Sequence, residues 1–280
     1  MKQPSYKMAQ ADPRPIEELI QLALNERDAD MAWEYVSALQ LRGDGEVFQA
    51  ADRLCTSELA TERELGATLI GQLGIPERTF PGKSFLCLTR MLQTETDPDT
   101  LQAIAVGFGH LNNPRCIELL APLKNHPASI VRWGVAHGIS RHNDPLAIQT
   151  LIELSGDEDE EIRDWATFGL GSLIDADTPE IREALWARTT DTYNDARAEA
   201  LAGLARRKDP RVAELLLQEL SAEHVDIMFI DAAEEFADRA LLPALMKLKV
   251  RWPLERVEEE QWLDEAIQSC SGFPGESLDQ

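Results

Sequence analysis

A short pattern occurs twice in succession between residues 130 and 173. Val131-Arg132 is followed, six residues after the arginine, by Gly138-Ile139, and Ile162-Arg163 is followed at the same distance by Gly169-Leu170. Looser copies of this unit lie on either side. Self-similarity at a fixed period indicates a repeat architecture, in which each unit buries its apolar face against its neighbours.

Two independent markers give the period. The first set is a recurring glycine, at spacings of 31, 31 and 34 residues: Gly107, Gly138, Gly169 and Gly203. The second set is a proline after a polar residue, at spacings of 31, 34 and 31 residues: Asn113-Pro114, Asp144-Pro145, Thr178-Pro179 and Asp209-Pro210. A polar N-cap followed by proline favours a helix start. A period near 31 with two helices per unit predicts an all-α fold, an α-solenoid or superhelix of about six to seven helical hairpins.

The rest of the chain divides around this array. We predict a flexible leader at residues 1–14 and irregular N-terminal helical repeats with a cap at 15–96. Regular repeats follow at 97–250, and a C-terminal capping helix and tail at 251–280. Asp30 is expected to cap a helix that Gly43 stops. The whole is predicted to be one continuous solenoid domain.

The repeats resemble HEAT repeats of the type named after phycobilisome (PBS) lyases. The turn aspartate, hydrophobic-arginine pair, small residue and Gly-Leu of that type occur in two copies: Asp157, Ile162-Arg163, Ala166 and Gly169-Leu170, then Asp191, Ala196-Arg197, Ala200 and Gly203-Leu204. The resemblance covers roughly residues 60–250. It weakens at the outer repeats, where Gln102 and Asp231 stand in the arginine's place. In addition, His126 stands in the aspartate's place before Arg132.

The resemblance implies that these aspartates and arginines form a ladder between neighbouring repeats. We expect Asp157 to be the partner of Arg163. Because the pair is expected to be partly exposed, Arg163→Ala should cost on the order of 1 kcal/mol.

The resemblance also implies that the arginine-bearing helices line the concave side of the solenoid. With 100° per residue, positions −1, +3, +7 and +10 from the arginine form the core face. In one copy they are Ile162, Ala166, Leu170 and Leu173. Positions +1 and +5 should face the groove: Glu64 and Thr68, Ala103 and Gly107, Trp133 and His137, Asp164 and Phe168, Ala198 and Ala202, and Ala232 and Phe236.

Large side chains interrupt the small and polar residues at these positions. Trp133, His137 and Phe168 do so directly, and Trp165 at +2 flanks the same surface. We predict an aromatic partner-binding ridge edged by carboxylates: Asp164, Glu160 and Glu161. The alternative is that the register is off by one residue or that Trp133 packs between repeats.

The net charge of −23 limits the partners. Nucleic-acid affinity depends on lysine and arginine displacing counterions, so direct nucleic-acid binding is not expected. Anionic membrane surfaces are disfavoured for the same reason. A protein partner with a basic or mixed basic and apolar surface would be attracted. The charge could equally serve solubility alone.

The cysteines and the N-terminus give the expected compartment. Cys55, Cys87, Cys116 and Cys270 lie far apart without CxxC spacing, so neither a disulfide framework nor a zinc site is indicated. No apolar window reaches the length of a membrane span, and no apolar signal-peptide core follows the first residues. We therefore expect a cytoplasmic protein without metal or cofactor.

Several proteins with HEAT-like repeats are enzymes. Deoxyhypusine hydroxylases use repeated His-Glu pairs, and this chain has none. Alkylpurine DNA glycosylases of this type need a basic groove, and nothing identifies the pigment site of a bilin lyase. The G-x-G pairs lie late in predicted helices, which favours close helix packing over phosphate binding. We predict a non-catalytic interaction scaffold or adaptor. The alternatives are an acidic inhibitor or immunity protein against a basic protein such as a nuclease toxin, and an enzyme of the glycosylase or bilin-lyase type.

Overall fold

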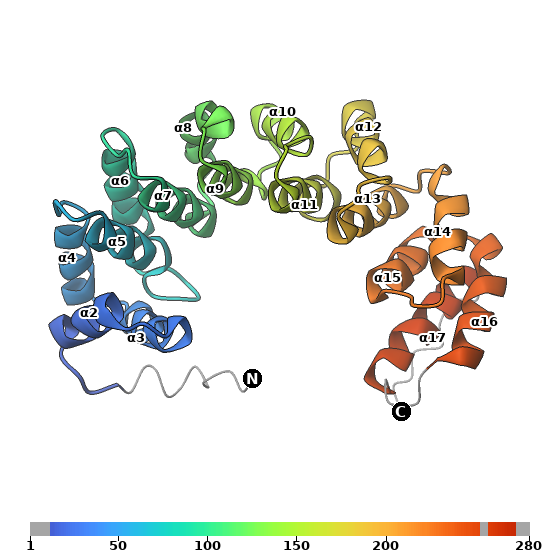
Figure 1. The fold of residues 1–280 in the computed structure, drawn as a ribbon, viewed down its shortest axis with the longest axis horizontal. Helices are drawn as coiled ribbons and strands as arrows, with labels where there is room; N and C mark the ends of the chain where they lie inside the picture. Colours follow the sequence, from blue (N-terminus) through green and yellow to red (C-terminus); the bar gives the residue numbers. More distant parts are fainter. Residues whose placement is uncertain (1–11, 253–256, 273–280) are drawn as a thin grey trace. The chain divides into compact units, whose positions relative to one another are not determined.

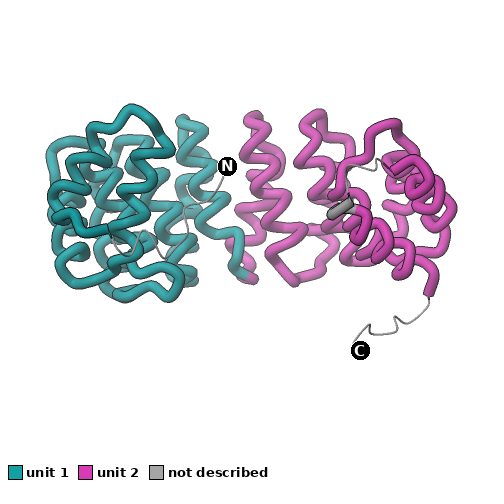
Figure 2. Tube along the Cα trace, turned by 90° about the horizontal axis from the view of Figure 1, so that it is seen from below, with its two compact units in different colours: residues 1–142 teal, residues 143–280 magenta. Residues whose placement is uncertain are grey.

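The computed structural model describes residues 12–252 and 257–272, and these ranges contain helices and no strand. The chain divides into two compact units, residues 1–142 and 143–280 (Figure 2). Parts of the predicted leader and tail, residues 1–11 and 273–280, lie outside the described residues.

Unit 1 is a stack of helical hairpins in two layers (Figure 1). Its elements are α2 (Ile16–Asn25), α3 (Ala29–Arg42), α4 (Gly45–Leu54), α5 (Ala60–Gln72), α6 (Pro81–Leu92), α7 (Pro98–Leu111), η1 (Pro114–Cys116), α8 (Ile117–Leu120), η2 (Ala121–Asn125) and α9 (Ser129–Ile139). The helices α5, α7 and α9 pack on one another in sequence and form one layer. The helices α4, α6 and α8 cover them.

Unit 2 repeats the arrangement. Its elements are α10 (Pro145–Leu154), α11 (Glu160–Phe168), η3 (Gly169–Leu173), α12 (Pro179–Arg188), α13 (Asn194–Arg206), α14 (Val212–Ser221), α15 (Ile227–Phe236), η4 (Arg239–Leu241), α16 (Leu242–Arg251) and α17 (Val257–Ser271). Here α11, α13, α15 and α17 form the continuous layer. We call α5, α7 and α9 of unit 1, and α11, α13, α15 and α17 of unit 2, the inner helices. The α-solenoid predicted from the period is confirmed.

Most predicted helix starts are where the sequence places them. Asp144 and Thr178 accept hydrogen bonds from the first backbone N–H groups of α10 and α12. Gly43 ends α3 in the left-handed conformation, with φ of 58°. Two starts differ. Asp28 rather than Asp30 caps α3, and α14 begins at Val212, two residues after Pro210.

The predicted core face holds until the end of α11. Ile162, Ala166 and Leu170 are buried, but Leu173 is only half-buried and Ile174 takes the inward place. The reason is that residues 169–173 form a π-helix. Its wider turn adds one residue, so a wheel advanced by 100° per residue is one position behind from there on.

The glycines act in helix packing, as predicted. Gly203 on α13 lies against Gly171 on η3, and a Cβ built on Gly203 would meet the Gly171 Cα at 2.6 Å. That Cβ would also lie 3.1 Å from Leu185 Cδ1. In unit 1, Gly71 and Gly107 meet in the same way, with 2.5 Å from the added Cβ to Cα. Side chains at these positions would force neighbouring inner helices apart.

Gly203→Ala should therefore lower the free energy of unfolding by about 1–3 kcal/mol, because backbone faces the new methyl group and must shift. Urea denaturation followed by circular dichroism measures this. Gly82→Ala is the matched control: it lies in α6, nothing stands within 4 Å of its Cβ, and alanine there should be neutral or stabilising. Equal urea midpoints for Gly203→Ala and the wild type would show that the contact between Gly203 and Gly171 can accommodate a methyl group without strain.

The predicted ladder exists, but Arg63, Arg163 and Arg197 pair with carboxylates further along the chain. Arg163 Nε and Nη2 donate to both carboxylate oxygens of Asp191, at 2.8 and 2.9 Å. Its Nη1 donates to the backbone carbonyl of Asp157 at 3.1 Å. Asp157 as side-chain partner of Arg163 is therefore wrong. Asp157 lies six residues before Arg163, and Arg163 binds its backbone carbonyl rather than its carboxylate. The carboxylate that binds Arg163 belongs to Asp191, about one repeat further along the chain.

The same geometry recurs in both units. In unit 1, Arg63 binds both carboxylate oxygens of Glu95, at 2.7 and 2.9 Å, and the backbone carbonyl of Ser57. In unit 2, Arg197 Nε donates to Glu219 at 3.3 Å. Glu95 and Asp191 each also accept from backbone N–H groups that follow them. The carboxylates thereby fix the turns that lead into α7 and α13.

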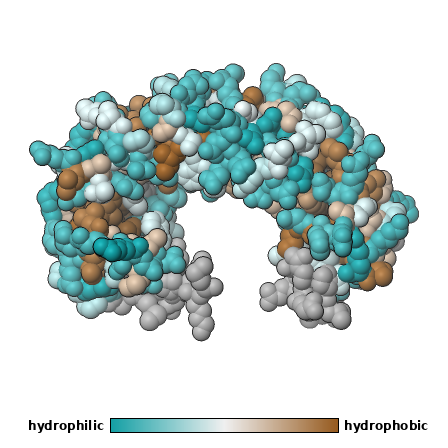
Figure 3. Space-filling model, viewed as in Figure 1, coloured by the Kyte–Doolittle hydropathy of each residue, from teal (hydrophilic) through white to brown (hydrophobic). Residues whose placement is uncertain are grey.

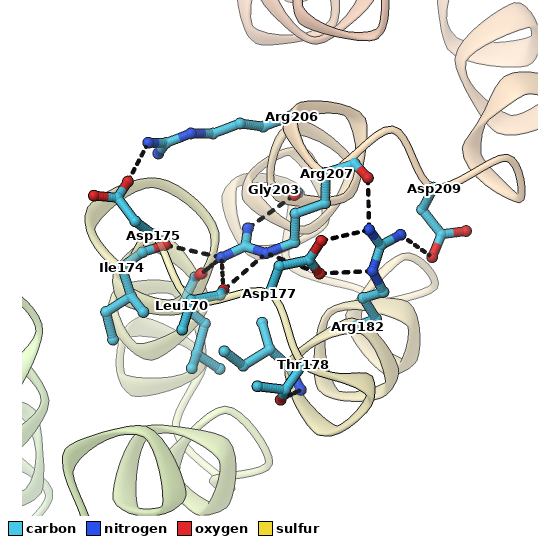
Figure 4. A network of polar contacts seen from close by, with 12 residues as sticks. Leu170, Ile174, Asp175, Asp177, Thr178, Arg182, Gly203, Arg206, Arg207 and Asp209 are labelled. Atoms are coloured by element: carbon cyan, nitrogen blue, oxygen red, sulfur yellow. Dashed lines mark hydrogen bonds and ion pairs between the residues drawn. The ribbon is translucent and has the colours of Figure 1, made fainter. Parts of the chain in front are cut away.

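A buried arginine closes the end of the π-helix (Figure 4). The guanidinium of Arg207 points into a ring of backbone carbonyl oxygens and donates to them at 2.8–3.0 Å; they belong to Leu170, Gly171, Ile174, Ala176 and Gly203. Helix ends leave carbonyls without intrahelical partners. Arg207 supplies the donors that this buried helix end lacks.

Candidate interaction surfaces

Hydrophobicity alone does not single out a working surface. Hydrophilic residues cover most of the face that Figure 3 shows, and hydrophobic residues are exposed in separate patches. The exposed large apolar side chains include Trp33 and Leu86 in unit 1 and Met246 and Val250 in unit 2. The arrangement of polar and aromatic side chains on the inner helices is more specific.

Positions +1 and +5 are less exposed than predicted. Ala103, Ala198, Ala232 and Phe236 are buried. The prediction that these positions face solvent is wrong for them, because neighbouring inner helices pack directly against each other and cover these side chains. The large or polar side chains at Trp133, His137, Asp164 and Phe168 remain half-buried. These residues therefore combine a packed base with an accessible part.

In unit 2, α11 carries five of the predicted site residues. Asp159 caps the helix by accepting from the N–H of Glu161, and Glu160 and Glu161 are exposed in its first turn. Trp165 and Phe168 meet edge to face with ring centroids 5.6 Å apart. In the sequence, Asp164 lies between the two glutamates and the two aromatic residues. It is half-buried, and its Oδ1 is inaccessible and accepts no hydrogen bond from the described residues.

Carboxylates from the adjacent inner helix α13 approach Asp164. Burial raises the pKa of Asp164 to about 6, with the charges of Asp195 and Glu161 adding to the shift. Burial also raises the pKa of Glu199 to about 7. The hydrogen bond from Ser172 lowers this pKa, whereas the charges of Asp164 and Asp195 raise it further. We call this surface the acidic aromatic face; its residues are Glu160, Glu161, Asp164, Trp165, Phe168, Asp195 and Glu199.

The surface continues toward α15. A depression of about 320 Å³ is lined by Ser172, Glu199, Ala202, Arg206, Met228, Asp231, Ala232 and Glu235. Burial raises the pKa of Asp231, and the charges of Asp226, Glu235 and Glu265 add to it. Negative charge thus accumulates along this side of unit 2 beyond what its few cations neutralise.

In unit 1, Trp133 and His137 belong to a different group. The two rings stack 5.5 Å apart with an interplanar angle of 26°. His110, from the end of α7, meets His137 at 5.3 Å and 68°. Burial lowers the pKa of both histidines to about 4, so both imidazoles are neutral at pH 7. The sequence-based prediction contained Trp133 and His137 but not His110.

The predicted site residues therefore fall into two groups in separate units. Sequence reasoning missed Asp195 and Glu199 in unit 2. Glu199 stands two residues after Arg197, the same +2 position that singled out Trp165 after Arg163. Reading that position along every repeat would have found it.

Among residues 12–252 and 257–272, no three histidine, cysteine, aspartate or glutamate side chains are arranged to hold a metal ion. None of the helices in these ranges combines the length and apolar character that crossing a membrane requires.

The stacked hairpins, the glycine contacts and the arginine ladder define an α-solenoid. The model of the HEAT-repeat family matches residues 88–171. The chain is similar to protein YibA of Escherichia coli K12, with 29% identity over 214 residues that cover 74% of this chain and 75% of that protein.

Two solved structures show the same fold. The crystal structure of Escherichia coli YibA superposes with a TM-score of 0.73 at 24% identity and covers 98% of this chain and 99% of that one. An engineered protein superposes with a TM-score of 0.50 at 17% identity, covering 96% and 84%. At these identities the likeness concerns the fold.

Proposed function

We propose that this HEAT-repeat protein is a non-catalytic scaffold or adaptor that binds a protein partner through the acidic aromatic face of unit 2. The partner would present lysine or arginine side chains among apolar groups. The observation that carries the proposal is that Asp164, on the same helix as the half-buried pair of Trp165 and Phe168, is faced by carboxylates of α13, among them Glu199. A cytoplasmic location is part of the proposal, and the four cysteines, all free thiols, suit a reducing compartment.

The electrostatics of the face support a cationic occupant. The pKa values of Asp164 and Glu199 are raised because each carboxylate loses water and faces other carboxylates. A cation within about 4–6 Å favours the charged form and lowers such a pKa by about 1–3 units. Binding a basic side chain would thus relieve the repulsion, while Trp165 and Phe168 supply apolar contact and attraction of a cation to their rings.

A second candidate is an acidic inhibitor or immunity protein, favoured by the net charge of −23. In that role the carboxylates of unit 2 would stand in for the phosphates that a basic nuclease binds. Association would then be strongly accelerated at low ionic strength. The two candidates share a surface and differ in the partner's activity, which a nuclease assay on the captured partner decides.

Perturbed carboxyl groups also occur in active sites. The enzymatic alternative would use Glu199, with its pKa near 7, as a general acid or base. Incubation with alkylated DNA and with bilin tests the two reaction types that resemblance to HEAT-like enzymes suggests. Turnover that Glu199→Gln abolishes would replace the binding proposal.

The binding test removes charge from the face without changing its shape. The variant Glu160→Gln/Glu161→Gln/Asp164→Asn should slow association with the captured partner at least 10-fold at low salt. The difference should shrink at about 0.5 M salt, because screening shortens the range of the field. Stopped-flow or surface-based kinetics measure the rate constants.

The control is Glu118→Gln/Glu214→Gln/Glu223→Gln, which changes the net charge equally at exposed carboxylates that make no hydrogen bond among the described residues. It should bind nearly as the wild type does. If both triple variants slow association equally, net charge rather than the acidic aromatic face attracts the partner. If neither has an effect, the face is not the binding surface.

A further inference from the structure

The ring of His110, near the C-terminal end of α7, lies beside the rings of His137 and Trp133 on α9. The two contacts, 5.3 Å and 5.5 Å between centroids, make a continuous row of three rings from two neighbouring repeats. Gly109 makes room for it. A Cβ at Gly109 would stand 2.9 Å from His137 Nδ1 and 3.1 Å from the Gly138 Cα. The second glycine of the G-x-G pair in α7 therefore leaves space for the imidazole.

The charges around this row are positive. Arg78 and Arg141 act on His110, and Arg141 also acts on His137, adding to the effect of burial on the pKa of each ring. No carboxylate contributes to either shift. The chain has 50 aspartates and glutamates against 27 lysines and arginines, so a positively charged site is unusual in it. The charge around these rings is opposite in sign to that of the acidic aromatic face.

Arg141 is a cation available to a ligand. It is exposed, follows His137 by four residues, and among the described residues makes no hydrogen bond or ion pair. Most other arginines of unit 1 have such partners, for example Arg63 with Glu95 and Arg90 with Asp52. A free guanidinium fork matches the two oxygens of a carboxylate and binds them in bidentate fashion.

We propose that His110, Trp133, His137 and Arg141 form a binding site for a carboxylate side chain, aspartate or glutamate, carried by a protein partner next to an apolar residue. Arg141 binds the carboxylate oxygens. The neutral imidazole of His110 donates one N–H to the same group. The face of Trp133 takes the adjoining apolar residue. We call these four residues the histidine patch.

The overall negative charge restricts which anion fits. At about 0.15 M salt the Debye length is about 8 Å, so a single carboxylate at the patch is governed by the nearest charges. A polyanion such as nucleic acid extends beyond that distance and meets the acidic surface with every further phosphate. An isolated carboxylate flanked by apolar groups is therefore favoured over nucleic acid.

The test uses a blocked peptide, acetyl-Gly-Phe-Glu-Phe-Gly-amide, and its counterpart with Gln in place of Glu. NMR of the full chain follows the indole of Trp133 and the imidazoles of His110 and His137, assigned by substitution. We expect the Glu peptide to shift these signals with a dissociation constant of roughly 0.1–1 mM, as suits one anchored contact. The Gln peptide and the variant Arg141→Gln should each bind at least 10-fold more weakly.

The control variant is Arg27→Gln, which removes one exposed arginine charge elsewhere in unit 1 and should bind the Glu peptide as the wild type does. Arg141→Gln should leave the circular-dichroism melt unchanged, because the side chain is exposed. Equal binding of the two peptides would overturn the proposal. So would unchanged affinity in Arg141→Gln, or a short single-stranded DNA that shifts the same signals more strongly than the Glu peptide. None of these outcomes concerns the acidic aromatic face, which is tested separately.

Discussion

Arg207→Met should lower the free energy of unfolding of unit 2 by about 3–5 kcal/mol. The side chain of Arg207 is 5% exposed, and its guanidinium serves the carbonyls of Leu170, Gly171 and Ile174 at the end of the π-helix. Methionine fills the volume but donates no hydrogen bond. Each buried carbonyl left without a donor costs about 1–3 kcal/mol. Part of this total cost is offset because methionine, unlike arginine, carries no charge that must be removed from water on folding. Urea denaturation followed by circular dichroism measures the change.

The adjacent residue supplies the control. Arg206 pairs with Asp175, whose side chain is 82% exposed, so Arg206→Met should cost less than about 1 kcal/mol. Amide hydrogen exchange should show the loss in Arg207→Met concentrated at α11, η3 and α13. A cost equal to that of Arg206→Met would mean that water satisfies the carbonyls as well as the guanidinium does.

Arg163→Ala should cost about 2–4 kcal/mol, which exceeds the value of about 1 expected for a partly exposed pair. The side chains of Arg163 and Asp191 are 13% and 3% exposed, and the contact is bidentate. Removing Arg163 leaves a buried carboxylate that only Arg188, at 3.2 Å, still pairs among the described residues. Urea unfolding at pH 7 measures the cost. Arg53→Ala, from a pair with Glu17 that is 63% and 70% exposed, is the control and should change stability by less than about 1 kcal/mol.

The same pair predicts a pH dependence. The hydrogen bonds of Arg163 lower the pKa of Asp191 to about 2, below the value of about 3.9 in an unfolded chain. The contribution of the pair is therefore complete above about pH 5 and is lost as the pH falls toward 2. The difference in stability between the wild type and Arg163→Ala should narrow over that interval. A constant difference from pH 7 to pH 3 would contradict the assigned pair.

The sequence predicts the elements of this fold because the repeat signals are local. A proline after a capping residue, as at Asp144-Pro145, acts within one helix turn, and the glycine period follows from contacts that recur in every repeat. Arg207 carries no such signal. It serves carbonyls more than 30 residues earlier, and the π-helix that positions them breaks the helical wheel at Leu173.

The candidate surfaces were predicted in part for the same reason. A wheel places Trp133 with His137, and Asp164 with Phe168, because each pair lies on one helix. It cannot place His110 beside His137 or Glu199 near Asp164, since these approaches depend on how neighbouring inner helices are aligned. Exposure was overestimated at Ala198 and Ala232, where the tight helix contact buries small side chains that a single-helix wheel turns outward.

The forward reach of the ladder arginines has a consequence for how this chain can be divided. Arg163 belongs to one hairpin by sequence, yet the carboxylate that it requires, Asp191, begins the turn of the next hairpin. Arg63 and Glu95 show the same offset in unit 1. The repeat that a sequence alignment would cut out therefore ends just before the carboxylate that neutralises its arginine. A fragment that ends between α12 and Asp191 keeps both helices of its last hairpin, α11 and α12. It nevertheless leaves Arg163 without the carboxylate that neutralises it.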